Sequence, residues 1–183
     1  PAPSSIYALD GMLDDLRVHN RVLTKAEIDY LATSRGVQGP APVGLGDEKL
    51  WLCPSLDDSP TDISGNGNNG TYQGGMGTVA DTSEGGTYAF DFDGTDDGIS
   101  LPLASTTLRP VNITLSFWVK GDGSNNFASV LCMDDGSVND WGVTLKDGGS
   151  SRRIGFQLAT ASGNLTPVST GFVYDLVADF GSG

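Results

Sequence analysis

Aspartate is the residue type in this chain that could do the most chemistry. The 183 residues include 23 Asp and Glu, and the only glutamates are Glu27, Glu48 and Glu84. Aspartate caps turns and disfavours strands and helices, so most of it is expected in loops. Loop carboxylates and carbonyls are ligands that Ca²⁺ takes. The pairs Asp96–Asp97 and Asp134–Asp135 could contribute such ligands, although both are more typical of hairpin turns.

Residues typical of catalysis are sparse. His19 is the only histidine, and no serine or cysteine near it forms a recognisable nucleophile arrangement. We therefore expect a surface or capping role for His19 and no enzymatic activity. Cys53 and Cys132 fit no metal-binding spacing. They could form a disulfide if their strands face each other, but two small buried apolar side chains are the simpler interpretation.

Charge and hydrophobicity exclude two classes of partner. The formal net charge is −13, and only 10 Lys and Arg are scattered along the chain, so the surface would repel nucleic acid. No apolar stretch approaches the ~20 residues of a membrane-spanning helix, and the first residues show no signal-peptide pattern. We therefore expect no membrane insertion.

A short helix is the clearest local prediction. Thr24 and Glu27 form a capping box, flanked by Leu23 and Ile28 in the positions of a hydrophobic staple. Gly36 supplies the left-handed stop. One apolar stripe is predicted on this helix, formed by Ile28, Leu31 and Ala32.

The rest of the chain favours strands. A strand is predicted in GMLDDLRVHN, residues 11–20, and a Pro/Gly connector follows the helix at residues 37–48. From residue 50 onward, short alternating segments recur between turns rich in Gly, Asn and Asp. With 26 glycines and only 18% charged residues, this spacing is typical of an all-β sandwich or barrel.

Four segments resemble the laminin-G-like, concanavalin-type jelly-roll family. They are the D-x-SGNGN-x-G loop from Asp62 to Gly70, the F-D-F-D-G-x-D-D turn from Phe90 to Asp97, the T-L-S-F-W-V-K strand from Thr114 to Lys120, and the G-x-L-D-D-L-R-V strand with its helix from Gly11 to Leu31. Together they lie within residues 11–120, about 60% of the chain. The family's closing strand and helix stand here before its opening motifs, and its later strand and hairpin motifs are missing after residue 165.

The resemblance implies an all-β fold, a two-sheet antiparallel jelly-roll sandwich of the concanavalin A type with one short N-terminal helix. Residues 1–36 would be the closing strand and capped helix, 37–48 the linker, and 49–183 the other sandwich strands. Either the chain straddles two tandem modules, or residues 1–183 form one permuted domain. The leading segment could also dock on another copy and give strand exchange. We favour the intramolecular arrangement, because the linker is long enough to join neighbouring strands.

The resemblance also implies a structural Ca²⁺ site where the first-motif loop meets the closing strand. By motif position, Asp62, Asn66 and Asp14 would be its ligands, with carbonyl groups of the glycine-rich loop. The alternative is that these side chains only stabilise turns by bonding their own backbone.

Aromatic residues are the other candidates for a binding site. A sugar needs an exposed ring to stack on and polar groups beside it, which makes Trp141 and Tyr72 the candidate ligand-binding residues. Trp51 and Trp118 lie in apolar strand contexts and are expected in the core.

These expectations describe a non-catalytic recognition or adhesion module of a secreted, cell-surface or phage virion appendage protein, which binds a glycan or a protein partner. The laminarinase branch of the superfamily uses an E-x-D-x-x-E strand, and no glutamate here has such a partner. Two alternatives stay open. One is a structural virion or fibre subunit that works by self-assembly, and the other is an accessory domain of a glycan-degrading enzyme.

Overall fold

The computed structural model describes residues 8–33, 45–54, 59–80, 88–102, 112–121, 128–133, 141–146, 153–159 and 165–167. This part of the chain is mostly β-strand with one short helix, as the composition predicts. Its elements are β1 (Asp10–His19), α1 (Lys25–Thr33), β2 (Leu50–Leu52), β3 (Thr71–Gln73), β4 (Gly77–Ala80), β5 (Tyr88–Asp93), β6 (Gly98–Ser100), β7 (Thr114–Gly121), β8 (Ala128–Met133), β9 (Trp141–Lys146), β10 (Arg153–Ala159) and β11 (Leu165–Pro167).

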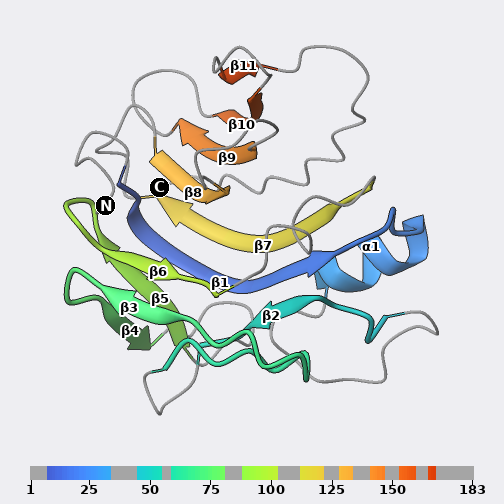
Figure 1. Cartoon of the computed structure of the whole chain (residues 1–183), viewed down its shortest axis with the longest axis horizontal. Coiled ribbons are helices and arrows are strands. Elements are labelled where there is room, and N and C mark those ends of the chain that lie inside the picture. The colour runs from blue at the N-terminus through green and yellow to red at the C-terminus, as the bar shows by residue number, and fades with distance from the viewer. Residues whose placement is uncertain are drawn as a thin grey trace.

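Strand β1 lies in the middle of the largest sheet (Figure 1). One edge of β1 pairs with β7 along nearly its whole length, from Gly11 opposite Gly121 to His19 opposite Thr114. The other edge is shared, because β5 pairs with its first half and β2 with its second half. Strand β4 extends this sheet beyond β5, and all of these pairings are antiparallel. The leading strand is thus built into a sheet with later strands of the same chain.

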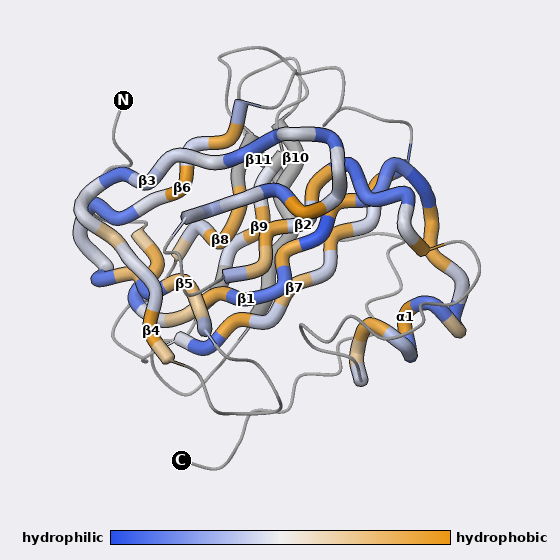
Figure 2. Tube along the Cα trace, turned by 90° about the horizontal axis from the view of Figure 1, so that it is seen from below, coloured by the Kyte–Doolittle hydropathy of each residue, from blue (hydrophilic) through white to orange (hydrophobic). Residues whose placement is uncertain are grey.

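The hydrophobic core joins the large sheet to the other strands. A four-stranded sheet has the order β11-β10-β9-β8, and β3 pairs with β6. Figure 2 shows hydrophobic and hydrophilic stretches alternating along β1 and β7, as expected when only one face of a strand meets the core. The core combines both larger sheets and the β3–β6 pair, and its members include Leu13, Val18, Leu50, Phe90, Tyr72, Ile99, Ala128 and Val143.

A β-bulge interrupts β1 at its centre. The register with β7 shifts between Asp14 and Arg17, and Asp15 adopts a φ of 49°, a left-handed conformation that Asp tolerates better than most residues. The bulge lies where the partner on the other edge changes, since pairing with β5 ends at Leu13 and pairing with β2 begins at Leu16. A bulge re-aims side chains, and the acidic pair of this strand is buried there.

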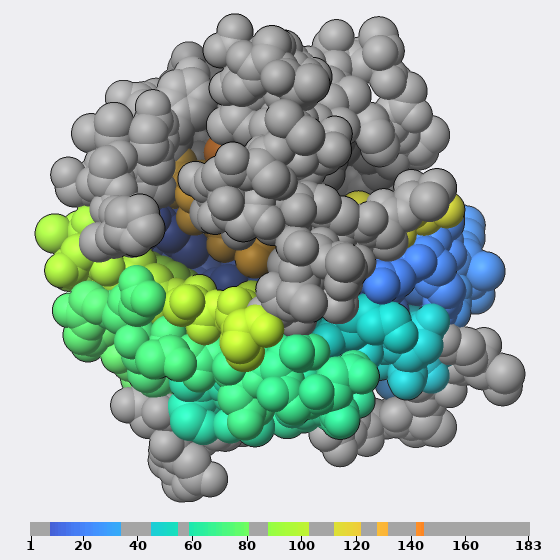
Figure 3. All heavy atoms as spheres, viewed as in Figure 1, coloured from blue at the N-terminus to red at the C-terminus, as the bar shows by residue number. Residues whose placement is uncertain are grey.

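The capping box of α1 is formed as predicted. The backbone N–H and the hydroxyl of Thr24 donate to Oε2 of Glu27 over 2.7 and 2.8 Å, and the Glu27 N–H points back to the Thr24 hydroxyl at 3.4 Å. The helix follows directly and lies at the edge of the molecule (Figure 3). The predicted stop at Gly36 lies outside the described residues.

The predicted apolar stripe of this helix is only partly right. Leu31 is buried, but Ile28 and Ala32 are exposed. Glu27 takes the inner position in place of Ile28, because its carboxylate binds Arg21 as well as the helix cap. The ion pair therefore sets which face of the helix turns inward.

Candidate functional site

Asp62, the first predicted metal ligand, anchors the glycine-rich loop that follows it. Its Oδ1 accepts hydrogen bonds from the backbone N–H groups of Trp51 and Ser64, both 3.0 Å, and its Oδ2 accepts one from Asn68 at 2.8 Å. Burial alone would raise the pKa of Asp62, but hydrogen bonds from Ser64, Trp51 and Asn68 together hold it below its ordinary value. The carboxylate is therefore ionised and already stabilises the turn.

Asn66 and Asn68 fasten the same loop to the chain before β2. The carboxamide of Asn66 donates to the carbonyl oxygen of Glu48 at 2.7 Å, and that of Asn68 donates to the carbonyl oxygen of Lys49 at 2.9 Å. These contacts explain why the loop carries so many asparagines, since each one satisfies a backbone group that would otherwise need water.

Asp14 lies in another part of the sheet. It is buried in β1 opposite Trp118, and its Oδ1 accepts the N–H of Asp15 at 2.7 Å. Leu52 of β2 pairs with Leu16 of β1 on one edge and bridges to Asp62 on the other. Strand β2 thus intervenes between Asp62 and the strand that holds Asp14. The loop brings Asp62 and Asn66 together, whereas a joint Ca²⁺ site with Asp14 stays a prediction.

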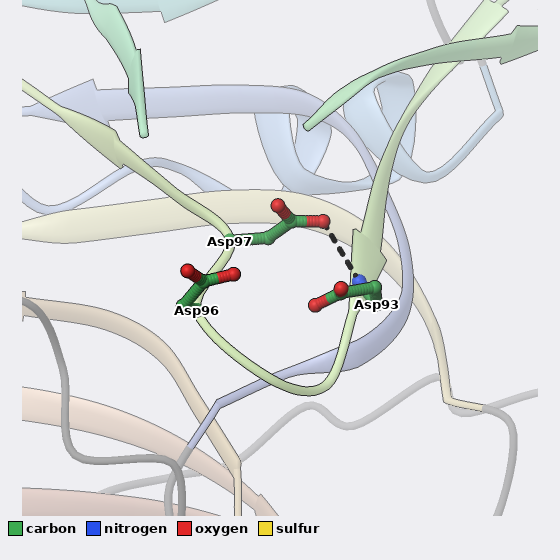
Figure 4. A group of neighbouring side chains, drawn as sticks. All are labelled: Asp93, Asp96 and Asp97. Carbon is green, nitrogen blue, oxygen red and sulfur yellow. Dashed lines mark hydrogen bonds between the residues drawn. The ribbon is translucent and has the colours of Figure 1, made fainter. Parts of the chain in front are cut away.

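Three carboxylates do gather at the turn between β5 and β6 (Figure 4). One oxygen each of Asp93, Asp96 and Asp97 lies within 4.8 Å of the others. Asp97 Oδ2 accepts the Asp93 N–H at 2.9 Å, and Asp93 Oδ1 accepts the N–H of Thr95 at 2.8 Å. Burial, and then the neighbouring aspartates, raise the pKa of Asp97. Such oxygens could hold a hard cation, and their hydrogen bonds also stabilise the turn. The turn is not the hairpin that the sequence predicts, because β5 pairs with β1 and β4 whereas β6 pairs with β3.

The charged residues of β1 form a buried ionic cluster that the sequence did not predict. We call Asp15, Arg17, Glu48 and Trp51 the Arg17 cluster. Arg17 Nε and Nη2 donate to the two carboxylate oxygens of Asp15 at 2.9 and 3.1 Å, and Nη1 lies 3.6 Å from Glu48 Oε1. The guanidinium stacks 3.8 Å from the centre of the Trp51 ring, and Trp51 Nε1 donates to Asp15 at 2.7 Å.

This cluster changes the expectation for Trp51. The ring is half-buried on the polar side of the sheet, outside the apolar core that Leu50 and Leu52 join from the same strand. A charge pair that is withdrawn from water needs good geometry and further hydrogen bonds to be tolerated. The bidentate contact, the indole N–H and the stacked ring supply them.

A second network joins the end of β1, the helix and the segment before β2. We call His19, Arg21, Glu27 and Asp47 the corner network. Arg21 Nη2 and Nη1 donate to Glu27 at 2.7 and 3.0 Å, while its Nε donates to Asp47 Oδ2 at 2.7 Å. Hydrogen bonds from Arg21 and Thr24 lower the pKa of Glu27 to about 2. Arg21 likewise lowers the pKa of Asp47, so both carboxylates are ionised.

His19 is an internal member of this corner network, which corrects the expected surface role. Its side chain is fully buried, and its Nδ1 lies 3.3 Å from Asp47 Oδ1. Burial lowers the pKa of His19, and the hydrogen bond to Asp47 opposes that effect. The capping box identifies Thr24 but not Arg21 as a partner of Glu27, and no sequence signal points to the burial of His19.

The predicted ligand-binding aromatic residues take different places. Tyr72 is half-buried in β3 and packs edge-to-face on Phe90, with ring centres 6.2 Å apart. Trp141 pairs through its backbone with Met133 and Leu158, and its side chain lies outside the described part. Cys53 is half-buried, and burial raises the pKa of its thiol to about 11. The side chain of Cys132 lies outside the described part of the chain, so the disulfide and the two-apolar-side-chain interpretations both stay predictions.

No family model, curated protein or solved structure matches this chain. Among the described residues, no helix is long and apolar enough to cross a membrane. The functional interpretation therefore depends on the residues and their geometry.

Proposed function

We propose that this chain is a non-catalytic recognition module of a secreted, cell-surface or virion appendage protein that binds a glycan surface. We further propose that its fold is a laminin-G-like jelly-roll sandwich in which the closing strand precedes the others. The same kind of module could bind a protein partner instead of a glycan, and binding assays with each ligand distinguish these two cases.

The position of β1 is the observation that supports this proposal best. All four segments that resemble the family meet around this strand. Strand β1 belongs to the closing motif, it pairs with β5 and β7 of the second and third motifs, and the loop of the first motif is fastened to β2 beside it. In the family the first and last strands lie side by side, and here β2 and β1 are antiparallel neighbours.

The roles of the charged side chains favour recognition over catalysis. A general acid or base must reach the substrate, but Asp15 and Glu48 are buried around Arg17, and Glu27 is taken up by Arg21 and the helix cap. The carboxylates that do reach the surface include Asp93 and Asp96, on the turn between two strands. Acidic loop tips with polar neighbours are suited to hold a cation or to bind hydroxyl groups.

A glycan array with the purified chain, run with Ca²⁺ and with a chelator, tests the proposal. We expect binding to a restricted set of glycans, and no bound glycan in either condition would contradict recognition of sugars. If binding needs Ca²⁺, Asp96→Asn and Asp62→Asn separate the two candidate cation sites. Asp29→Asn is the matched control, because Asp29 is an exposed acid on α1 that pairs only with Lys25 among the contacts described.

The melting temperature provides a second, independent readout for the metal. A cation that binds only the native state must raise stability, so Ca²⁺ should raise the melting temperature and a chelator should reverse the rise. An unchanged melting temperature would remove Ca²⁺ from the proposal while leaving glycan binding open to the array. Sedimentation tests the alternative that the chain works by self-assembly, since a stable monomer would not support it.

A further inference from the structure

His19 is buried in a way that allows only one protonation state without rearrangement. Asp47 is ionised, so its carboxylate can only accept a hydrogen bond, and Nδ1 of His19 must therefore carry the proton that is donated over 3.3 Å. Nε2 is then a bare acceptor. It is buried, and it has no hydrogen-bond partner among the described residues.

Protonation of the His19 ring is unfavourable in the native structure. The new N–H would sit at Nε2, where no acceptor faces it among the residues described, and an unpaired buried donor on a cation is costly. Neutral His19 is tolerated better, because a missing partner for a lone pair costs less than an isolated buried charge. Water could solvate the charged ring only if the corner opened.

The charged groups around the His19 ring have opposite effects on its protonation. Asp47 and Glu48, from the segment before β2, attract a positive imidazole, while Arg21 from the turn after β1 repels it. The partner of His19 on β7 is the uncharged Thr114, whose hydroxyl donates to the carbonyl oxygen of Arg21 at 2.7 Å. The effect of burial outweighs the attraction, which lowers the pKa of His19.

We propose that His19 is a proton-sensitive latch that holds the segment Asp47–Lys49 against the end of β1 at neutral pH and releases it when the solution becomes mildly acidic. The outer side of the contact already reaches solvent, since the Asp47 side chain is 45% exposed. The Lys49 N–H donates to the carbonyl oxygen of Val18 at 2.7 Å, next to the ring. Release would thus free the chain that leads into β2 and unlink it from Arg21 and α1.

The chain contains one histidine, which makes the test direct. NMR of the single imidazole between pH 8 and 4.5 should give one midpoint, below the 6.5 of an unperturbed histidine. Hydrogen exchange of the Lys49 N–H, corrected for the intrinsic effect of pH, should lose protection over the same range. A midpoint at or above 6.5, or constant protection of Lys49 through the titration, would overturn the latch.

Two variants separate a latch from a merely structural histidine. His19→Asn keeps a donor near the Nδ1 position but cannot titrate, so protection of Lys49 should no longer fall on acidification. Equal loss in this variant would refute the proposal. Should His19→Asn not fold, Asp47→Asn answers the question, because removing the carboxylate should shift the imidazole midpoint further down. The matched control Asp29→Asn should leave both readouts unchanged.

Discussion

Replacing Arg17 with methionine removes the charge that holds the Arg17 cluster together. Methionine keeps much of the aliphatic volume, but Asp15 retains only the Trp51 N–H as a described side-chain donor, and Glu48 loses its buried counter-ion. Removing one partner of a buried ion pair costs about 3–5 kcal/mol. The lost cation–π contact contributes up to about 2 kcal/mol where the pair is desolvated. The free energy of unfolding should therefore fall by at least about 3 kcal/mol, a large part of the about 5–15 kcal/mol of an ordinary domain.

A double-mutant cycle measured by urea unfolding isolates the pair. Asp15→Asn preserves the shape and the tolerance for a positive φ, so the combined variant with Arg17→Met should cost less than the sum of the single ones, by about 0.5–3 kcal/mol. Lys25→Met is the matched control, since its ion pair with Asp29 is exposed, with side chains 79% and 60% accessible, and should change stability by less than about 1 kcal/mol. If Arg17→Met cost no more than Lys25→Met, or if the cycle were additive, the cluster would not act as a buried pair.

Three further changes test other parts of the structure. Gly11→Ala should be far more destabilising in thermal unfolding than Gly46→Ala: both have positive φ, but a Cβ at Gly11 would overlap the carbonyl oxygen of Lys120 in β7, whereas nothing lies within 4 Å at Gly46. Equal losses would mean that β7 does not approach β1 so closely. Glu27 has a folded pKa of about 2 against 4.5, so the stability it contributes is complete above pH 4.5 and is lost as the pH falls towards 2; Glu27→Gln should flatten the pH dependence of unfolding in that window, and an unchanged slope would count against its ion pair. Asp62→Ala should cost at least about 1.5–3 kcal/mol, the loss of a hydrogen bond to a charged group, and should raise hydrogen exchange at Ser64 and Asn68; unaltered exchange there would show that the loop does not need the carboxylate.

Local patterns predicted local structure well. The capping box of Thr24 and Glu27 forms because both partners lie within one turn of backbone. The apolar stripe failed at Ile28 because Arg21, outside the helix, draws Glu27 inward. Helical periodicity considers only the residues of the helix itself, so it cannot register an ion pair with a residue of the turn that follows β1.

The sites depended on contacts between distant segments, which the sequence does not encode locally. Asp15 and Trp51 stand 36 positions apart, and their hydrogen bond exists only because β1 and β2 pair. The bulge that buries the acidic pair has no sequence signature beyond two adjacent aspartates inside a strand. That unusual placement of charge, in the middle of an otherwise apolar segment, was the available signal for the Arg17 cluster.

The central place of β1 has a consequence for how the chain acquires its structure during synthesis. Its partners are encoded much later, and the last of its pairs joins Gly11 to Gly121. A ribosome would have to produce more than a hundred residues before the first strand could complete both of its edges. Contacts between such remote residues slow folding, and strand edges are prone to aggregation as long as they stay unpaired. The aspartates of this strand oppose such aggregation, because charged side chains disfavour the pairing of an exposed strand edge with another chain.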